Sequence, residues 1–201
     1  MPIRAKDLKI IGRKGLNFAT SYFRSWKMET KRILDECLAY DLKNSKILKV
    51  LKKEPDLHEC SKVLREHYQT IRNVFTLFAS REISSETNYG VSSLTSMNFG
   101  REFGYISKKL PDALYEIKFI TSLTKEGEKL NDPNKLMVRS SFFEFLVRLA
   151  EEKYVRGKFL DKDGKEIKYS YADGLRKLIE KLTAYDSVYN FTQWRTNRYW
   201  N

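Results

Sequence analysis

The chain has 201 residues, of which 41% are hydrophobic and 13% aromatic, which suits one compact domain with or without an arm. No span of about 20 apolar residues occurs, which excludes a membrane helix. The N-terminus lacks the apolar region of a secretory signal, although its basic composition leaves a mitochondrial presequence open. The 38 Lys and Arg against 26 Asp and Glu give a net charge of +12. This excess favours nucleic acid, an anionic membrane or an acidic protein surface as partner.

Half of the net charge lies in residues 1–28, which form a basic, aromatic arm. Only Asp7 opposes the basic residues of this segment, which are Arg4, Lys6, Lys9, Arg13, Lys14, Arg24 and Lys27. Four aromatic residues are interleaved with them: Phe18, Tyr22, Phe23 and Trp26. This pattern indicates an arm that lies on an acidic partner and is anchored by its rings. A frayed, solvated terminus is the alternative.

Residues 29–60 are predicted to be a linking helical region. Apolar residues recur at three- and four-residue steps from Glu29 to Leu51, and Pro55 is expected to end the region. A second helix is predicted over 64–79, with one apolar face made of Leu64, Tyr68, Ile71, Phe75 and Phe78.

After a polar loop over 80–90, the segment SSLTSMNFGREFGYI predicts a helix that is capped by a serine. Its expected packing residues are Leu94, Phe99, Phe103 and Ile106. Pro111 and Asp112 open another helix, since proline is tolerated in the first helical turn. The loop 124–135 then follows.

The stretch SSFFEFLVRLAEEKY, residues 140–154, predicts a helix that is buried on several sides, because its apolar arc is too wide for a surface helix. Its charged residues Glu144, Arg148 and Glu152 lie four apart on the remaining strip. We interpret them as an i, i+4 ladder worth a few tenths of a kcal/mol per pair, and not as a paired-carboxylate active site.

The last third of the chain is predicted to hold a hairpin and a helix. Asp163-Gly164 lies between two short β-prone runs, which is typical of a type I′ hairpin turn. A helix is expected from Tyr171 to Tyr189. The segment 191–201 is rich in aromatic residues, and Trp194 and Trp200 are candidate anchors. Such a segment is either docked on the core or exposed to a partner.

Two similar units occupy the middle of the chain. In each, a helix and a polar loop lead to a hydrophobic position, and a phenylalanine five residues later opens a second helix: Leu94 to Phe99, and Met137 to Phe142. This is the organisation of a pair of EF-hands. The expected fold is therefore mainly α, with paired helix–loop–helix units, flanking helices, a small β-hairpin and an extended basic N-terminal arm.

The segments LREHYQTIRNVFTLFA, SSLTSMNFGREF, DALYEIKFITSL and LMVRSSFFEFLVRLAEEKY resemble the degenerate EF-hand-like helical domain of ciliary and flagellar proteins. The resemblance covers roughly residues 61–190. Those proteins often carry a segment similar to R-x-x-F-x-E-x-L-x-R-x-A-x-x-K-Y, which here consists of Arg139, Phe142, Glu144, Leu146, Arg148, Ala150, Lys153 and Tyr154. The resemblance implies a microtubule-associated structural component of the axoneme, and it implies no catalysis.

The two loops are poor in calcium ligands. A calcium loop needs oxygen ligands at positions 1, 3, 5 and 9 and a bidentate glutamate at position 12. With Leu94 at position 8, position 12 is Asn98; with Met137 at position 8, position 12 is Ser141. Neither loop has the closing carboxylate, so we expect no calcium site.

A zinc site and a catalytic site have weaker support in the sequence. Cys37, His58, Cys60 and His67 are the right residue types for zinc, but their spacing fits no zinc finger. No orienting group or oxyanion-binding turn accompanies them, so we expect no enzyme activity and no cofactor. The two cysteines are also too few for a disulfide framework, which favours a reducing compartment.

Two functions therefore stay open. The first is a non-catalytic adaptor of the ciliary axoneme, whose basic arm docks on tubulin or on another axonemal protein of a large complex. The second is a nucleic-acid-binding or ribonucleoprotein component, possible also in a mitochondrion, which would use the same arm on phosphates. The helices carry no recognisable nucleic-acid-binding motif. Neither reading involves a membrane or a small-molecule substrate.

Overall fold

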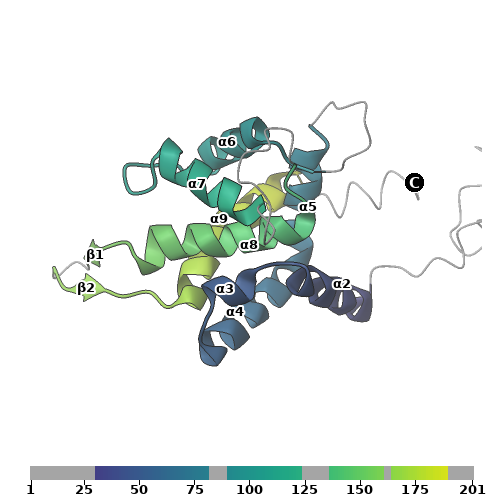
Figure 1. Cartoon of the computed structure of the whole chain (residues 1–201), viewed down its shortest axis with the longest axis horizontal. Helices are drawn as coiled ribbons and strands as arrows, with labels where there is room; N and C mark the ends of the chain where they lie inside the picture. The colour runs from purple at the N-terminus through teal and green to yellow at the C-terminus, as the bar shows by residue number, and fades with distance from the viewer. Residues whose placement is uncertain (1–29, 82–89, 124–135, 161–163, 190–201) are drawn as a thin grey trace, which may run out of the picture.

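The computed structural model describes residues 30–81, 90–123, 136–160 and 164–189, with side chains as far as Ala184. Within these residues the chain forms eight α-helices, one π-helical turn and a two-stranded hairpin (Figure 1). The predicted mainly α fold with a small β-hairpin is confirmed. The predicted arm 1–28 and the aromatic segment 191–201 lie outside the described residues.

The first three helices are α2 (Lys31–Lys43), α3 (Ile47–Val50) and α4 (Glu54–Glu66). The Thr30 hydroxyl caps α2 by accepting a hydrogen bond from the Ile33 N–H at 3.4 Å. Pro55 was expected to end this region, but it lies in the first turn of α4. A proline fits there because the first N–H groups of a helix have no partner within the helix.

The helix predicted over 64–79 is divided at His67. Helix α4 ends at Glu66, and α5 spans Tyr68–Ala79. The backbone of His67 leaves the helical region, with φ −109° and ψ 11°. The predicted apolar face is nevertheless confirmed, because all five of its side chains are at most 2% exposed: Leu64, Tyr68, Ile71, Phe75 and Phe78. The predicted boundary between residues 60 and 61 falls inside α4.

Helices α6 (Ser93–Glu102) and α7 (Asp112–Leu123) form a second layer. The predicted serine cap is Ser92, whose hydroxyl accepts a hydrogen bond from the Thr95 N–H at 3.2 Å. Leu94 was expected in the core, but it is 71% exposed. Five residues along a helix correspond to a rotation of roughly 140°, so Leu94 lies almost opposite the buried Phe99.

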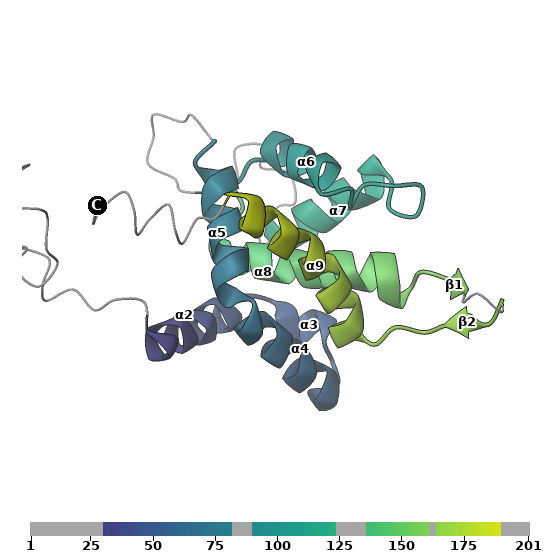
Figure 2. The ribbon, with the colours of Figure 1, turned by 180° about the vertical axis from the view of Figure 1, so that it is seen from behind.

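Helix α8 (Arg139–Ala150) runs through the middle of the molecule, with α2–α4 on one side and α6–α7 on the other (Figures 1 and 2). It packs against α2, α3, α5, α7 and α9. Nine of its twelve residues are buried. The predicted core helix is confirmed. It continues as a π-helical turn, η3 (Glu151–Val155).

Helix α9 (Tyr171–Tyr189) has the predicted range and packs against α4, α5, α8 and η3. Its fully buried residues Leu175, Leu178, Ile179 and Leu182 repeat at helical spacing. Helix α9 therefore lies beside α5 and α8 (Figure 2), and its apolar face is buried.

Strands β1 (Phe159–Leu160) and β2 (Glu166–Ile167) form the hairpin. Phe159 pairs with Ile167, and Leu160 pairs with Glu166. A two-residue type I′ turn at Asp163-Gly164 would pair Leu160 with Ile167 instead. The hairpin is confirmed, with an odd number of residues between its strands, and Asp163 of the predicted turn lies outside the described residues.

The two helix–loop–helix units, α5–α6 and α7–α8, are joined through their loops. The Val91 N–H donates to the Met137 carbonyl at 2.9 Å, and the Met137 N–H donates to the Val91 carbonyl at 2.8 Å. Both side chains are at most 2% exposed. Leu94 was predicted to lie opposite Met137. Because Val91 lies there, the predicted register of the first loop is wrong by three residues.

Candidate functional site

The predicted partner-binding residues all lie outside the described residues. They are Arg4, Lys6, Lys9, Arg13, Lys14, Arg24 and Lys27, with the aromatic anchors Phe18, Tyr22, Phe23, Trp26, Trp194 and Trp200. The folded helices carry further candidates in two clefts that lie on either side of α3.

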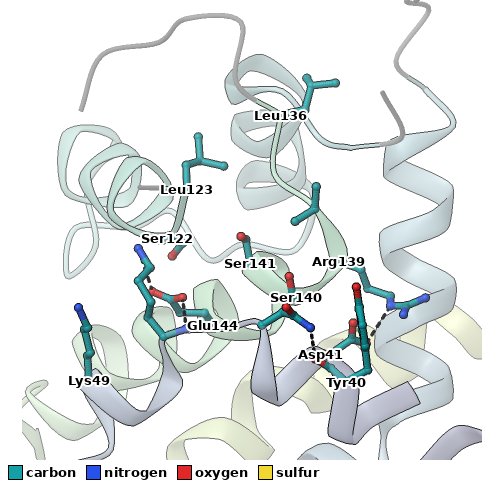
Figure 3. A pocket seen from close by; sticks show the side chains of 13 residues that line it. Tyr40, Asp41, Lys49, Ser122, Leu123, Leu136, Arg139, Ser140, Ser141 and Glu144 are labelled. Atoms are coloured by element: carbon teal, nitrogen blue, oxygen red, sulfur yellow. Dashed lines mark hydrogen bonds and ion pairs between the residues drawn. The ribbon is translucent and has the colours of Figure 1, made fainter. Parts of the chain in front are cut away.

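The first cleft has a volume of about 590 Å³ and lies between α2, α3, the end of α7 and the start of α8 (Figure 3). Its walls combine apolar side chains, such as Leu123 and Leu136, with the charged residues Lys46, Lys49 and Arg139. Two buried carboxylates, Asp41 and Glu144, also line it.

Asp41 is 1% exposed and binds two groups from other helices. The Tyr68 hydroxyl of α5 donates to its carboxylate at 2.7 Å, and Arg139 Nε of α8 donates at 2.8 Å. Burial, together with the hydrogen bond to Asp41, raises the pKa of the Tyr68 hydroxyl. This cluster joins α2, α5 and α8, and it keeps the phenol protonated as a donor.

Glu144 is also 1% exposed. Its carboxylate accepts hydrogen bonds from Arg148 Nε at 2.8 Å and from the Lys46 backbone N–H at 2.8 Å. The Lys46 ammonium lies 3.9 Å from the same carboxylate and donates to the Thr121 carbonyl at 2.9 Å. Glu144 therefore connects α8 to the turn between α2 and α3, and the Lys46 ammonium connects that turn to α7.

The predicted i, i+4 pair of Glu144 and Arg148 forms, but the pair is buried, so the small stabilisation expected of an exposed pair does not apply to it. The Glu144 and Arg148 side chains are 1% and 16% exposed, and Glu152 pairs with Lys118 of α7 at 2.7 Å. Helical spacing locates the polar strip of α8, but it does not show that other helices cover that strip as well.

The second cleft has a volume of about 450 Å³ and adjoins the first, because Lys49 lines both. It lies between the α3–α4 connection and the elements α8, η3 and α9. Five of its lining side chains are cationic and two are anionic: Lys49, Lys52, Lys53, Arg148 and Arg156, with Asp56 and Glu151. Positive charge therefore dominates it.

Glu151 is already engaged within the second cleft. Arg156 Nη2 donates to it at 2.8 Å, and the Tyr171 hydroxyl donates at 3.3 Å. The charge of Glu151 raises the pKa of Arg156. Burial, together with Glu151, raises the pKa of Tyr171.

The lysines of these clefts were not predicted as binding residues. The segment KILKVLKKEP places Lys46, Lys49 and Lys52 three residues apart, with Lys53 next to the last of them. That spacing is a signal for a charged helical stripe. It is a weaker signal than the denser positive charge of residues 1–28.

No cysteine or histidine lines either cleft. Burial and the charge of Asp56 raise the pKa of the Cys60 thiol to about 12, so the thiol stays protonated near neutral pH. Among the described residues, no group of three His, Cys, Asp or Glu side chains could hold a metal ion. None of the described helices is long and apolar enough to cross a membrane.

The observed bridge changes the ligand register of the first loop. With Val91 opposite Met137, the residue four places further on is Thr95 in the first loop and Ser141 in the second. A calcium loop has its bidentate glutamate at that place. Neither loop supplies a carboxylate there.

The described residues form two adjoining clefts, of which the second is mainly cationic, and the buried acids Asp41 and Glu144 of the first are paired with cations. Such an arrangement suits recognition of an acidic group better than proton transfer. Comparison of the chain with models of protein families, with curated proteins and with solved structures gave no match.

Proposed function

We propose that the protein is a non-catalytic adaptor of the ciliary axoneme, which docks on acidic surfaces of tubulin or of a neighbouring axonemal protein. The basic arm 1–28 supplies long-range attraction. The helical part acts as a calcium-independent, EF-hand-like scaffold. The observation that carries the proposal is the mutual Val91–Met137 bridge between two helix–loop–helix units that lack the closing carboxylate.

The packing of α9 supports a scaffold that stays closed. Sensor EF-hands open an apolar groove for a partner when calcium binds. Here Leu175, Leu178 and Leu182 of α9 are fully buried against the chain's own helices. Displacing them would expose their apolar surface to water at about 1.5–3 kcal/mol per side chain. The adaptor therefore uses its surface and its arm, and not an opened core, to bind partners.

The axonemal assignment comes from the resemblance of residues 139–154. Their structural roles agree with a scaffold: Phe142, Leu146 and Ala150 are buried, and Glu144 pairs with Arg148. None of these roles involves a substrate.

The proposal is tested by co-sedimentation of the full chain with microtubules at physiological salt, beside binding to a structured RNA. We expect microtubule binding, and we expect deletion of residues 1–28 to abolish it while the helical part stays folded by circular dichroism. Tight RNA binding without microtubule binding would support the nucleic-acid reading instead. Loss of folding on deletion would show that the arm is part of the globule.

A further inference from the structure

The two clefts form one cationic strip along α3 and the connection to α4. We define the α3 strip as Lys46, Lys49, Lys52, Lys53, Arg148 and Arg156. Lys49 lines both clefts, and the Glu144–Arg148 ion pair links them, since Glu144 lines the first and Arg148 the second. We propose that the α3 strip is a second docking surface, which binds an acidic polypeptide segment through its Asp and Glu side chains. This deepens the proposed function and rests on it.

The six cations of the strip exceed the acids beside them: Glu144 pairs with Lys46 and Arg148, Glu151 pairs with Arg156, and Asp56 lines the second cleft. Asp41 is bound by Arg139 and Tyr68, and Glu151 by Arg156. Lys52 and Lys53 are exposed, and neither forms an ion pair with any residue that the structure describes. A partner that brings carboxylates therefore meets cations that no internal acid neutralises.

The end of the first cleft where α8 begins can bind a carboxylate by donating hydrogen bonds to it. Helix α8 begins there at Arg139, and its N-cap residue Val138 makes no side-chain hydrogen bond. The first N–H groups of a helix have no partner within the helix and favour negative charge. Ser140 is 9% exposed, lines the cleft (Figure 3), and its hydroxyl has no hydrogen-bond partner among the described residues. The hydroxyl is open to the cleft and can donate a hydrogen bond to a ligand there.

The lining of the clefts favours a polypeptide over a nucleic acid. Binding of single strands stacks successive bases on several aromatic faces, whereas each cleft is lined by one aromatic residue, Tyr40 or Tyr171. Leu123, Leu136 and other apolar residues of the first cleft suit the apolar side chains that a peptide carries between its acids.

The test measures binding of a fluorescently labelled oligoglutamate peptide to the full chain by anisotropy at physiological salt. Lys52→Glu with Lys53→Glu is expected to weaken binding about tenfold, because two attractive charges become repulsive. The matched control is Lys108→Glu with Lys168→Glu, which makes the same change in net charge at exposed lysines outside both clefts. The control is expected to change the dissociation constant by no more than about twofold.

A second variant tests the end of the first cleft. Ser140→Ala removes one donor and is expected to weaken peptide binding about threefold, in line with the loss of one hydrogen bond. Melting temperatures of all variants should equal that of the wild type within about 2 °C, because none of the substituted side chains forms a hydrogen bond or ion pair with another described residue.

The outcomes separate this inference from the proposed function. Suppose that the wild type co-sediments with microtubules, but that Lys52→Glu with Lys53→Glu binds oligoglutamate as tightly as the control variant does. The α3 strip is then not the docking surface, and the proposed function stands. If the wild type binds oligoglutamate through the strip but not microtubules, the inference holds and the axonemal partner is wrong. Failure of the wild type to bind oligoglutamate, or tighter binding to an RNA of equal charge, overturns the inference.

Discussion

Asp41 and Glu144 are buried carboxylates that are paired with cations: Asp41 with Arg139 of α8, and Glu144 with Arg148 of its own helix and with Lys46. Each accepts an arginine Nε at 2.8 Å, and each accepts a second hydrogen bond from another element. Burying an ion pair contributes little net stability, because desolvation opposes the attraction between the charges. Removing one partner costs much more, since the remaining charge stays buried. These residues therefore specify how α2, α3 and α8 fit together.

Replacement of Glu144 by glutamine tests this role. Glu144→Gln is expected to lower the free energy of unfolding by about 2–4 kcal/mol, because Arg148 and Lys46 lose their shared anion. The matched control is Glu36→Gln, which breaks another Glu–Arg pair of i, i+4 spacing at a site where both side chains are more than half exposed. It should cost no more than about 0.5 kcal/mol. Urea denaturation of both variants makes the measurement, and equal losses would contradict a structural role for the buried pair.

At the scale of elements, α6 and α7 approach closely at Gly100. A Cβ atom at this position would lie 2.6 Å from Tyr115 Cζ and 2.9 Å from Ile106 Cδ1. The Tyr115 ring has no room to move, because it is fully buried and its hydroxyl donates to the Ser96 carbonyl at 2.8 Å. Glycine is required here by packing and not by backbone conformation.

Gly100→Ala is accordingly expected to destabilise the fold by about 1–2 kcal/mol. The clash with Tyr115 outweighs the gain in helix propensity of roughly 1 kcal/mol that alanine brings. Asn98→Ala, on the exposed side of the same helix, is the control and should be neutral or slightly stabilising. A stabilised Gly100→Ala variant, measured by thermal unfolding, would show that α6 and α7 can separate without cost.

The C-terminal end of α6 is held by two lysines from other elements. Lys153 Nζ donates to the carbonyls of Gly104 and Tyr105 at 2.8 and 2.9 Å, and Lys181 Nζ donates to those of Phe103 and Gly104 at 3.0 and 3.2 Å. Cations suit this end of a helix. Burial and the charge of Lys181 lower the pKa of Lys153 to about 8.

This shift predicts a pH dependence of stability. Between pH 8 and the ordinary lysine value of 10.5, the unfolded chain holds a proton that folded Lys153 has lost, so the free energy of unfolding rises with pH. Above about pH 10, buried Tyr105 and Tyr115 act in the opposite sense, because burial raises the pKa of each and only the unfolded chain ionises there. Stability should therefore pass through a maximum between pH 8 and 10.5.

Urea titrations at several pH values test this dependence on the wild type and on Lys153→Met. The variant should lose the rise above pH 8 and keep the fall above pH 10, since only the lysine has been removed. An unchanged rise in Lys153→Met would assign it to another group.

For the whole molecule, the loops predict that calcium does not stabilise the fold. Stabilisation by a ligand requires a site that binds the folded state, and Thr95 and Ser141 stand where a calcium loop has its glutamate. Millimolar Ca²⁺ should shift the melting temperature no more than Mg²⁺ does. A calcium-specific shift of several degrees would contradict the ligand count and the proposed calcium-independent scaffold.

Much of the fold follows from local pattern. The range of α9, the hairpin, the serine cap of α6 and the buried character of α8 were all predicted, because caps, turn residues and helical spacing act over a few neighbouring residues. The breaks at Asn44 and His67 were not predicted. At the first, the Asn44 amide and the Ser45 hydroxyl bind carbonyls of the last turn of α2, which competes with continuation of the helix.

The helical class of the protein, its core helix and its excess of positive charge follow from the sequence, since they depend on composition and on spacing along the chain. The packing of the helices sets three other features: Val91 and not Leu94 faces Met137, Glu144 is buried, and lysines of α3 and its flanks border adjoining clefts with Arg148 of α8 and Arg156 after η3. Each of these depends on residues far apart in the sequence, whose meeting is set by how the helices pack. Spacing within one helix carries no information about that packing.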